Sequence, residues 1–296
     1  MRITDKRFAT LLMLPAAAFL GVFVVWPLAQ FVADSFFDIT PIGGERRFIG
    51  FGNYIAAFQS ADFANAVWRT LAYTAIVVVL EFTIGFAVAL LFAALGDRSR
   101  IFRTIFLYPL MIAPVVAGLL WRFLLIDNFG IVNELLTRAG ILQSSTDIQW
   151  LSDPDIALYS VAIPDIWLTT SFISLVLFAG LQNIPGDVIE AARIDGARYP
   201  TILLRILLPL LRPVIAVALI VRGIDAARAF DVILIQTNGG PQSSTETLSL
   251  LIYRTKVRFG DPGLASAMGT VYLVVMLAVA IVAILSIWRP GSDEKP

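Results

Sequence analysis

Several charged side chains lie inside long apolar stretches of this 296-residue chain, and four of them recur at a spacing of three: Arg222, Asp225, Arg228 and Asp231. A charge within the hydrocarbon core of a membrane is costly, so each of these residues is a functional candidate. Neighbours three apart on one helix touch, and the alternating signs predict a ladder of ion pairs. Such a ladder holds a helix in register, or it forms a polar wall against a hydroxylated solute. In either case it should face a water-filled cavity or another subunit.

Two further charged residues, Glu81 and Asp165, stand alone in their apolar stretches. A proton relay is one interpretation, but a satisfied hydrogen bond between helices is the favoured one. Trp121 and Trp167 either belong to an interfacial aromatic belt or stack on a sugar ring; the belt is preferred for Trp121, and both alternatives stay open for Trp167. Asn238 completes the candidate solute path, within a turn-forming run that ends in Gly239-Gly240-Pro241.

Several kinds of chemistry have no residues to support them. The chain contains no histidine and no cysteine, which removes the usual general base, the usual metal ligand and any thiolate chemistry. No GxxxxGK[ST] loop occurs, so we expect no ATP site of the P-loop type on this chain. The net charge of zero indicates no nucleic-acid partner. We therefore expect no catalytic residue, no metal site and no cofactor bound by this chain.

Composition predicts an all-α protein of the membrane. Hydrophobic residues make up 58% of the chain and charged residues only 15%, with a mean hydropathy of +0.82. A soluble domain is nearer a quarter charged. About 20 apolar residues suffice to cross a bilayer. We predict a single transmembrane domain over 1–296, with six spans at 8–33, 71–95, 104–125, 156–184, 206–236 and 264–288.

The N-terminal segment and the distribution of basic residues predict how the chain is oriented across the membrane. A signal peptide could end near Ala16-Ala17-Ala18, but the apolar run continues to Trp26, which favours an uncleaved first span. Twelve basic residues lie on one predicted side of the spans and six on the other. The positive-inside rule then places both termini and the loop 185–205 in the cytoplasm, although the basic cluster 254–258 opposes this.

The loop 185–205 has the pattern of a short helix. Pro185 ends the preceding span, and Asp187 is placed as an N-cap with Glu190 three residues later, as in a capping box. Gly196 is placed to end the helix, because glycine tolerates the left-handed conformation that such an end requires. The pattern alone is equally typical of a capped loop helix with no further role.

This loop resembles the EAA–G–LP motif of binding-protein-dependent ABC importer permeases, through Glu190-Ala191-Ala192, Asp195-Gly196-Ala197 and Leu208-Pro209. The resemblance implies a coupling helix that docks on a cytoplasmic ATPase. It implies that Glu190 caps and positions the helix, that Ala191 and Ala192 dock closely, and that Gly196 makes the turn. This chain has Tyr199-Pro200-Thr201 where the family often carries an aromatic residue and a threonine, so Pro200 is expected to reshape the link to the fifth span.

Four further stretches resemble maltose-type and glycerol-3-phosphate-type sugar permeases: Tyr108-Pro109 to Asn133, Trp167 to Leu181, Arg228-Ala229-Phe230-Asp231, and Thr237 to Thr247. The resemblance implies one permease subunit of an inner-membrane importer for a saccharide or glycoside, which works by alternating access. Its implied partners are membrane lipid, a second non-identical permease, two P-loop ATPase subunits that carry ATP-Mg, and an extracytoplasmic solute-binding protein. An anionic sugar could use Arg222 or Arg228.

Two other classes of protein remain as alternatives. The first is a secondary transporter that uses Glu81 and Asp165 as ion-coupling carboxylates. Such proteins often show internal repeats, and none is evident here. The second is a membrane-embedded enzyme, which has little support because histidine and cysteine are absent and no span carries convergent carboxylates.

Overall fold

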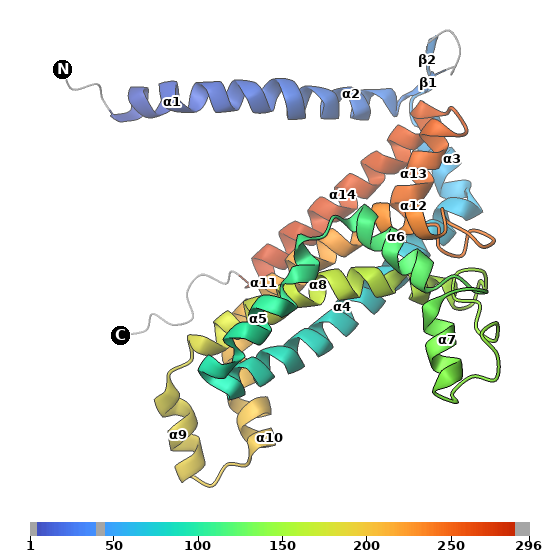
Figure 1. Cartoon of the computed structure of the whole chain (residues 1–296). Helices are drawn as coiled ribbons and strands as arrows, with labels where there is room; N and C mark the ends of the chain where they lie inside the picture. Colours follow the sequence, from blue (N-terminus) through green and yellow to red (C-terminus); the bar gives the residue numbers. More distant parts are fainter. Residues whose placement is uncertain (1–4, 40–44, 288–296) are drawn as a thin grey trace. The chain divides into compact units, whose positions relative to one another are not determined.

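The computed structural model describes residues 5–39 and 45–287, and most of them are helical (Figure 1). The chain divides into two compact units. The first unit combines the residues up to 65 with 251–275, and the second combines 66–250 with the residues from 276 onward. Three helices, α4 (Ala61–Leu95), α13 (Leu248–Val257) and α14 (Pro262–Ile287), each contribute residues to both units.

The first unit begins with a long apolar helical stretch. Its elements are α1 (Asp5–Leu20), the π-helical turn η1 (Gly21–Val25), α2 (Trp26–Asp34), β1 (Phe37–Ile39), β2 (Arg46–Phe48), α3 (Gly52–Gln59), most of α13 (Leu248–Val257) and the first half of α14 (Pro262–Ile287). The chain keeps right-handed helical dihedrals through Leu20, Val25 and Trp26, so α1, η1 and α2 run on without a break.

A short β-hairpin in the first unit departs from the all-helical prediction. Strands β1 and β2 pair antiparallel, with Asp38 opposite Arg47, and the two side chains form an ion pair at 3.0 Å. Asn53 at the start of α3 donates to the carbonyl oxygens of Ser35 at 3.0 Å and Phe37 at 2.9 Å. These bonds satisfy carbonyl groups at the point where α2 gives way to the hairpin.

The second unit carries all the candidate functional residues. Its elements are most of α4 (Ala61–Leu95), η2 (Gly96–Ser99), α5 (Arg100–Phe106), η3 (Tyr108–Met111), α6 (Pro114–Leu124), α7 (Ile131–Arg138), α8 (Ala157–Gln182), α9 (Gly186–Ile194), α10 (Tyr199–Ile202), η4 (Leu203–Leu207), α11 (Leu208–Ala227), α12 (Asp231–Gln236), the start of α13 and the second half of α14.

Five helical stretches among the described residues are long and apolar enough to cross a membrane: Leu12–Asp34, Ala61–Met111, Ala157–Gln182, Tyr199–Gln236 and Pro262–Leu285. They account for five of the six predicted spans. The second begins ten residues earlier than the predicted 71–95, because 61–70 contains no proline or glycine to stop a helix.

The segment of the predicted third span, 104–125, is not one continuous helix. It is divided among the end of α5, the 3₁₀ turn η3 and the 11-residue helix α6. Pro109 and Pro114 have no N–H to donate to a preceding helical turn, and each stands at the start of a new element. With 11 residues, α6 is shorter than the roughly 20 residues that a full crossing requires.

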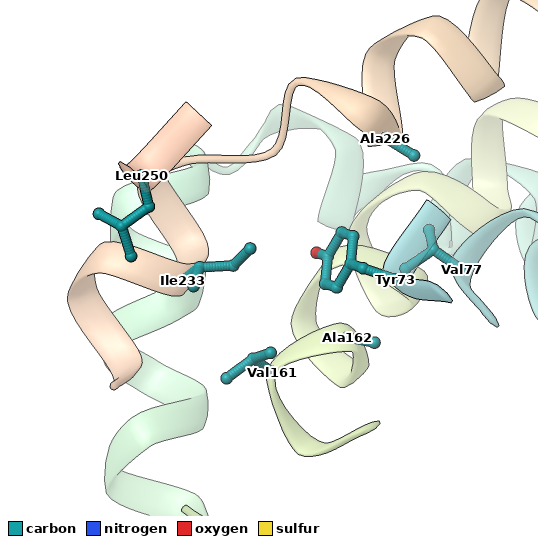
Figure 2. Close-up of a cluster of buried hydrophobic side chains, with 7 residues drawn as sticks. All are labelled: Tyr73, Val77, Val161, Ala162, Ala226, Ile233 and Leu250. Atoms are coloured by element: carbon teal, nitrogen blue, oxygen red, sulfur yellow. The ribbon is translucent and has the colours of Figure 1, made fainter. Parts of the chain in front are cut away.

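The core of the second unit forms where four helices and the start of α13 meet (Figure 2). Seven buried side chains make this cluster: Tyr73 and Val77 from α4, Val161 and Ala162 from α8, Ala226 from α11, Ile233 from α12, and Leu250. A second buried cluster joins Phe92 of α4 with Ile173 and Phe178 of α8. The two clusters fix α4, α8 and α11 side by side, and these are the helices that carry Glu81, Asp165 and Arg222.

Candidate functional site

Arg222 is the centre of a buried ion-pair network that joins three helices. Its Nε and Nη2 atoms donate to Glu81 of α4 at 2.6 and 2.9 Å. Nη2 also lies 2.7 Å from a carboxylate oxygen of Asp165 on α8. Nη1 donates to Asp225, one turn further along α11, at 2.9 Å. The planar guanidinium suits such an arrangement, because its donors point in several fixed directions at once.

Neutral side chains complete the network. The Thr169 hydroxyl donates to Glu81, and the Tyr73 hydroxyl donates to the second oxygen of Asp165 at 3.0 Å. The side chains of Glu81 and Arg222 are 0% and 2% exposed. Buried charges are tolerated only where they are paired and hydrogen-bonded, and both conditions are met here. The favoured interpretation of Glu81 and Asp165 as partners in hydrogen bonds between helices is confirmed.

The predicted four-residue ladder on one helix is only partly correct. Arg222 pairs with Asp225, and Asp225 pairs with Arg228 at 3.3 Å. However, α11 ends at Ala227 and α12 begins at Asp231, so Arg228 and Asp231 do not share the helix. The backbone is outside the helical region at Arg228 (φ −86°, ψ 7°) and at Phe230 (φ −137°, ψ −58°), and hydrophobic periodicity alone does not reveal a break of three residues.

The break in the helix opens a polar cavity. Its volume is about 260 Å³, close to the roughly 300 Å³ at which small-molecule sites begin. It is lined by Pro114, Asp165, Arg222, Asp225, Arg228, Ala229, Phe230, Asp231 and Val232, and we refer to it as the inner cavity. The four ladder residues thus meet around one space. Arg222 is held by carboxylates, whereas the side chains of Asp225 and Arg228 remain 56% and 62% exposed.

Two candidates for the solute path lie outside the inner cavity. Trp167 is 37% exposed and stands edge-on to Trp121, with 6.1 Å between ring centroids, but it does not line the cavity. Asn238 lies beyond α12 in a left-handed conformation (φ 50°). Its side-chain oxygen is buried and finds no hydrogen-bond partner among the described residues.

The short helix predicted in the loop 185–205 is present as α9, but its start differs from the prediction. Pro185, not Asp187, occupies the N-cap position, and no side chain caps the helix, so the predicted capping box of Asp187 with Glu190 is wrong. An N-cap residue must be non-helical, whereas Asp187 lies in the first turn. There its carboxylate still complements the positive end of the helix dipole.

The end of α9 confirms the predicted role of Gly196 as a helix stop. Gly196 has φ +80°, which only glycine adopts readily. Its N–H bonds the Arg193 carbonyl at 3.0 Å, and the Ala197 N–H bonds the Ala192 carbonyl at 2.9 Å. These two bonds make a Schellman motif, with Asp195 as the C-cap. The direction in which the chain leaves α9 is therefore fixed.

The two faces of α9 differ. Ala192 is 8% exposed and packs with Ile202 and Leu207 of the following segment. Glu190 and Ala191 are exposed, and Ile194 is 86% exposed. Ala191 and Ile194 therefore offer a small apolar outer surface, whereas Ala192 holds the helix to its own chain.

The link from α9 to α11 carries the proline of the motif. Pro209 has no N–H, so the Arg205 carbonyl four residues earlier has no helical partner there. A π-helical turn, η4, lies at this place, and the Leu208 N–H bonds the Leu203 carbonyl five residues back. Pro200 lies in the first turn of α10, where a missing N–H costs little.

The sequence did not identify Tyr73 and Thr169 as members of the network, because nothing in the sequence distinguishes their hydroxyl groups from others in apolar stretches. The isolated charges of Glu81 and Asp165 did indicate that these residues need partners. Which residue they pair with depends on how α4, α8 and α11 pack. Among the described residues, no group of three or more histidine, cysteine, aspartate or glutamate side chains could hold a metal ion.

Fold and site together define a multi-pass helical membrane protein with a charged network at its core and a short helix outside its spans. Comparison with known proteins gives the family. Residues 83–289 match the model of the binding-protein-dependent transport system inner membrane component, and the chain belongs to this family. It is thus a transport subunit of the inner membrane.

Individual relatives cover nearly the whole chain. The chain is 37% identical to the sulfoquinovosyl glycerol transport system permease protein SmoG of Agrobacterium fabrum, over 94% of this chain and 89% of that protein. It is 33% identical to the trehalose/maltose transport system permease protein MalF of Thermococcus litoralis, over 95% of this chain and 94% of that protein. The crystal structure of a bacterial ABC transporter involved in alginate import contains a chain of the same fold, with a TM-score of 0.83, 24% identity and 98% coverage of both chains.

Proposed function

We propose that this chain is the permease subunit of an ATP-driven importer that carries a saccharide or glycoside, and that the inner cavity contacts the solute. The supporting observation is the exposed Asp225–Arg228 pair, which lines a cavity beside the buried Arg222 network. A carboxylate accepts hydrogen bonds from sugar hydroxyls and a guanidinium donates them. The relatives named for sulfoquinovosyl glycerol and for trehalose/maltose support the same class of solute.

The proposed coupling element is α9. Closure of the ATPase dimer would press on the exposed face at Glu190, Ala191 and Ile194. Because Ala192 is packed on the segment that leads into α11, a displacement of α9 moves the base of α11. The Schellman motif at Gly196 and the turn before Pro209 lie on this route, and the far end of α11 carries Arg222 and Asp225 at the inner cavity.

The complex that we propose contains a second, non-identical permease, two P-loop ATPase subunits that bind ATP with Mg²⁺, and an extracytoplasmic solute-binding protein. This chain would contribute no ATP site of its own. We propose six membrane crossings, with the third formed by α5, η3 and α6 together, and both termini in the cytoplasm. The basic residues near Arg98 and Arg193 support this orientation.

The ion-coupled alternative is disfavoured by one observation. A carboxylate that couples transport to an ion gradient must exchange its cation during the cycle. Glu81 is 0% exposed and receives two N–H groups of Arg222, and Asp165 shares the same guanidinium. Both carboxylates therefore already have the permanent cation Arg222 as their ion-pair partner.

The test is a pull-down of the tagged protein from native membranes in a mild detergent, followed by mass spectrometry. We expect a P-loop ATPase and a second permease to be recovered with it. Recovery of the protein alone or as a homo-oligomer, under conditions in which a known complex survives, would argue for the ion-coupled transporter.

A further inference from the structure

A second cavity, of about 360 Å³, lies at the other end of two helices that border the inner cavity. We call it the outer cavity, and it is lined by Arg122, Ile126, Asp127, Leu151, Ser152, Gln236, Thr237, Gly240 and Pro241. None of the residues that line the inner cavity is among them. The proposed function does not use this space.

Helices α6 and α12 connect the two cavities. Their first residues, Pro114 and Asp231, line the inner cavity, and residues near their ends, Arg122 and Gln236, line the outer one. At a rise of 1.5 Å per residue, the two cavities are about 8 Å apart along α12. The two helices are in contact at Gly118, where a Cβ would lie 3.4 Å from the Val232 Cα.

The outer cavity is lined by polar groups, one of which is a buried amide with unused hydrogen-bonding capacity. Gln236 is 3% exposed, its Oε1 has no hydrogen-bond partner among the described residues, and its Nε2 makes one long bond of 3.4 Å to the Val161 carbonyl. Asp127 accepts from the Ser152 hydroxyl, and Arg122 donates to the Ile235 carbonyl at 2.9 Å. A buried amide with unused capacity is costly unless a ligand or water satisfies it.

The outer cavity also has an apolar side and a rigid wall. Ile126, Leu151 and Pro241 supply apolar surface next to the polar groups. The wall around Leu151 is held by Asn133, whose amide donates to the Ser145 and Ile148 carbonyls, both at 2.8 Å. Apolar surface with a few fixed polar groups is the usual composition of a small-molecule site.

We propose that the outer cavity is a second carbohydrate-binding site, which takes one uncharged sugar ring before the solute reaches the inner cavity. The ring's C–H face packs on the apolar side, and its hydroxyls reach Gln236, Asp127 and Ser152. The charges of Arg122 and Asp127 offset each other, so an anionic solute gains no net attraction. The inference rests on the proposed function, because it assumes that the solute is a carbohydrate.

The test uses the absence of cysteine from this chain. Ser152→Cys places a thiol in the outer cavity, and Gln143→Cys places a control thiol at an exposed residue of the same connecting segment that does not line the cavity. Each variant is reconstituted in the complete complex with cysteine-free partner subunits. Its reaction rate with a methanethiosulfonate reagent is measured with and without trehalose, maltose or sn-glycerol 3-phosphate at equal osmolarity.

We expect trehalose or maltose to slow the reaction at Ser152→Cys at least about fivefold and to leave Gln143→Cys unchanged. The anionic sn-glycerol 3-phosphate should protect neither thiol. Failure of both disaccharides to protect Ser152→Cys, or equal protection of both thiols, would overturn the inference.

A kinetic measurement gives an independent test. Loss of one hydrogen bond is worth about 0.5–1.5 kcal/mol, so Gln236→Leu should raise the KM for uptake about 2- to 10-fold. Gln149→Leu, at an exposed position outside the cavity, is the matched control and should not change KM. An unchanged KM in Gln236→Leu contradicts the site. If ATP drives carbohydrate uptake but the sugars do not protect Ser152→Cys, the outer site is refuted and the proposed function stands. If no ATP-dependent carbohydrate uptake occurs, the proposed function itself is refuted.

Discussion

The Arg222 network predicts a large and asymmetric effect of substitution. Arg222 makes four contacts between 2.6 and 2.9 Å with the carboxylates of Glu81, Asp165 and Asp225. Arg222→Gln would leave the Glu81 carboxylate fully buried without its cation, with only neutral donors such as the Thr169 hydroxyl near it. Removal of one partner from a buried ion pair typically costs about 3–5 kcal/mol.

The matched control is Arg228→Gln. Arg228 belongs to the same segment and pairs with the same Asp225, but its side chain is 62% exposed. Exposed pairs contribute roughly 0–1 kcal/mol, so this variant should unfold much like the wild type. The double variant Glu81→Gln with Arg222→Gln removes both charges and should recover a large part of the loss.

The assay is the free energy of unfolding in mixed micelles of a mild detergent and sodium dodecyl sulfate, followed by circular dichroism. A loss for Arg222→Gln no larger than that for Arg228→Gln would refute the account of the network. A double variant that is less stable than Arg222→Gln alone would do the same, because it would show that the uncompensated carboxylate is not the cause.

Three further predictions concern the proposed coupling element α9, the inner cavity and the segment after α6. Gly196→Asp should abolish uptake while the protein remains in the membrane, because φ +80° costs an ordinary residue roughly 1–2 kcal/mol and the exit from α9 shifts; uptake and membrane content are measured together. Asp225→Asn should raise the KM for uptake about fivefold, a cost of roughly 1 kcal/mol, because it weakens the acceptor shared by the two arginines of the inner cavity. Asn133→Ala removes bonds to three backbone carbonyls and one from the Trp150 indole, so trypsin should cleave at Arg138 several times faster.

The predictions for Gly196 and Asn133 each have a control in the same region. Gly186→Asp makes the same change in the first turn of α9, where a carboxylate is favourable, and should keep uptake. Glu134→Gln removes the exposed pair with Arg138, so it separates that pair from the effect of Asn133. Normal uptake in Gly196→Asp would count heavily against the coupling role, and an unchanged KM in Asp225→Asn would remove that residue from the solute path.

The parts of the fold that sequence predicted are those governed by local chemistry. Apolar runs of about 20 residues identified five spans, and glycine at position 196 identified the end of α9. The start of α9 was misplaced because Asp187 and Pro185 are both acceptable near a helix start, and the choice depends on the backbone angle at Pro185 (ψ 134°).

The site was predictable only as a set of residues. Charge in an apolar stretch singled out Arg222, Glu81 and Asp165, but these residues come from three helices 57 to 141 positions apart in the chain. Their pairing depends on which faces of α4, α8 and α11 meet, and that is decided by packing of the whole bundle. The break after Ala227 was not predicted, because residues 228–230 contain no proline or glycine that would indicate the end of a helix.

The most direct test of the central claim is uptake of a radiolabelled disaccharide into proteoliposomes that contain the complete complex, with ATP enclosed on the ATPase side. The account predicts uptake that requires ATP and the solute-binding protein and that Gly196→Asp abolishes. Uptake without ATP, driven by an imposed proton or sodium gradient, would contradict it and would return attention to Glu81 and Asp165 as coupling carboxylates.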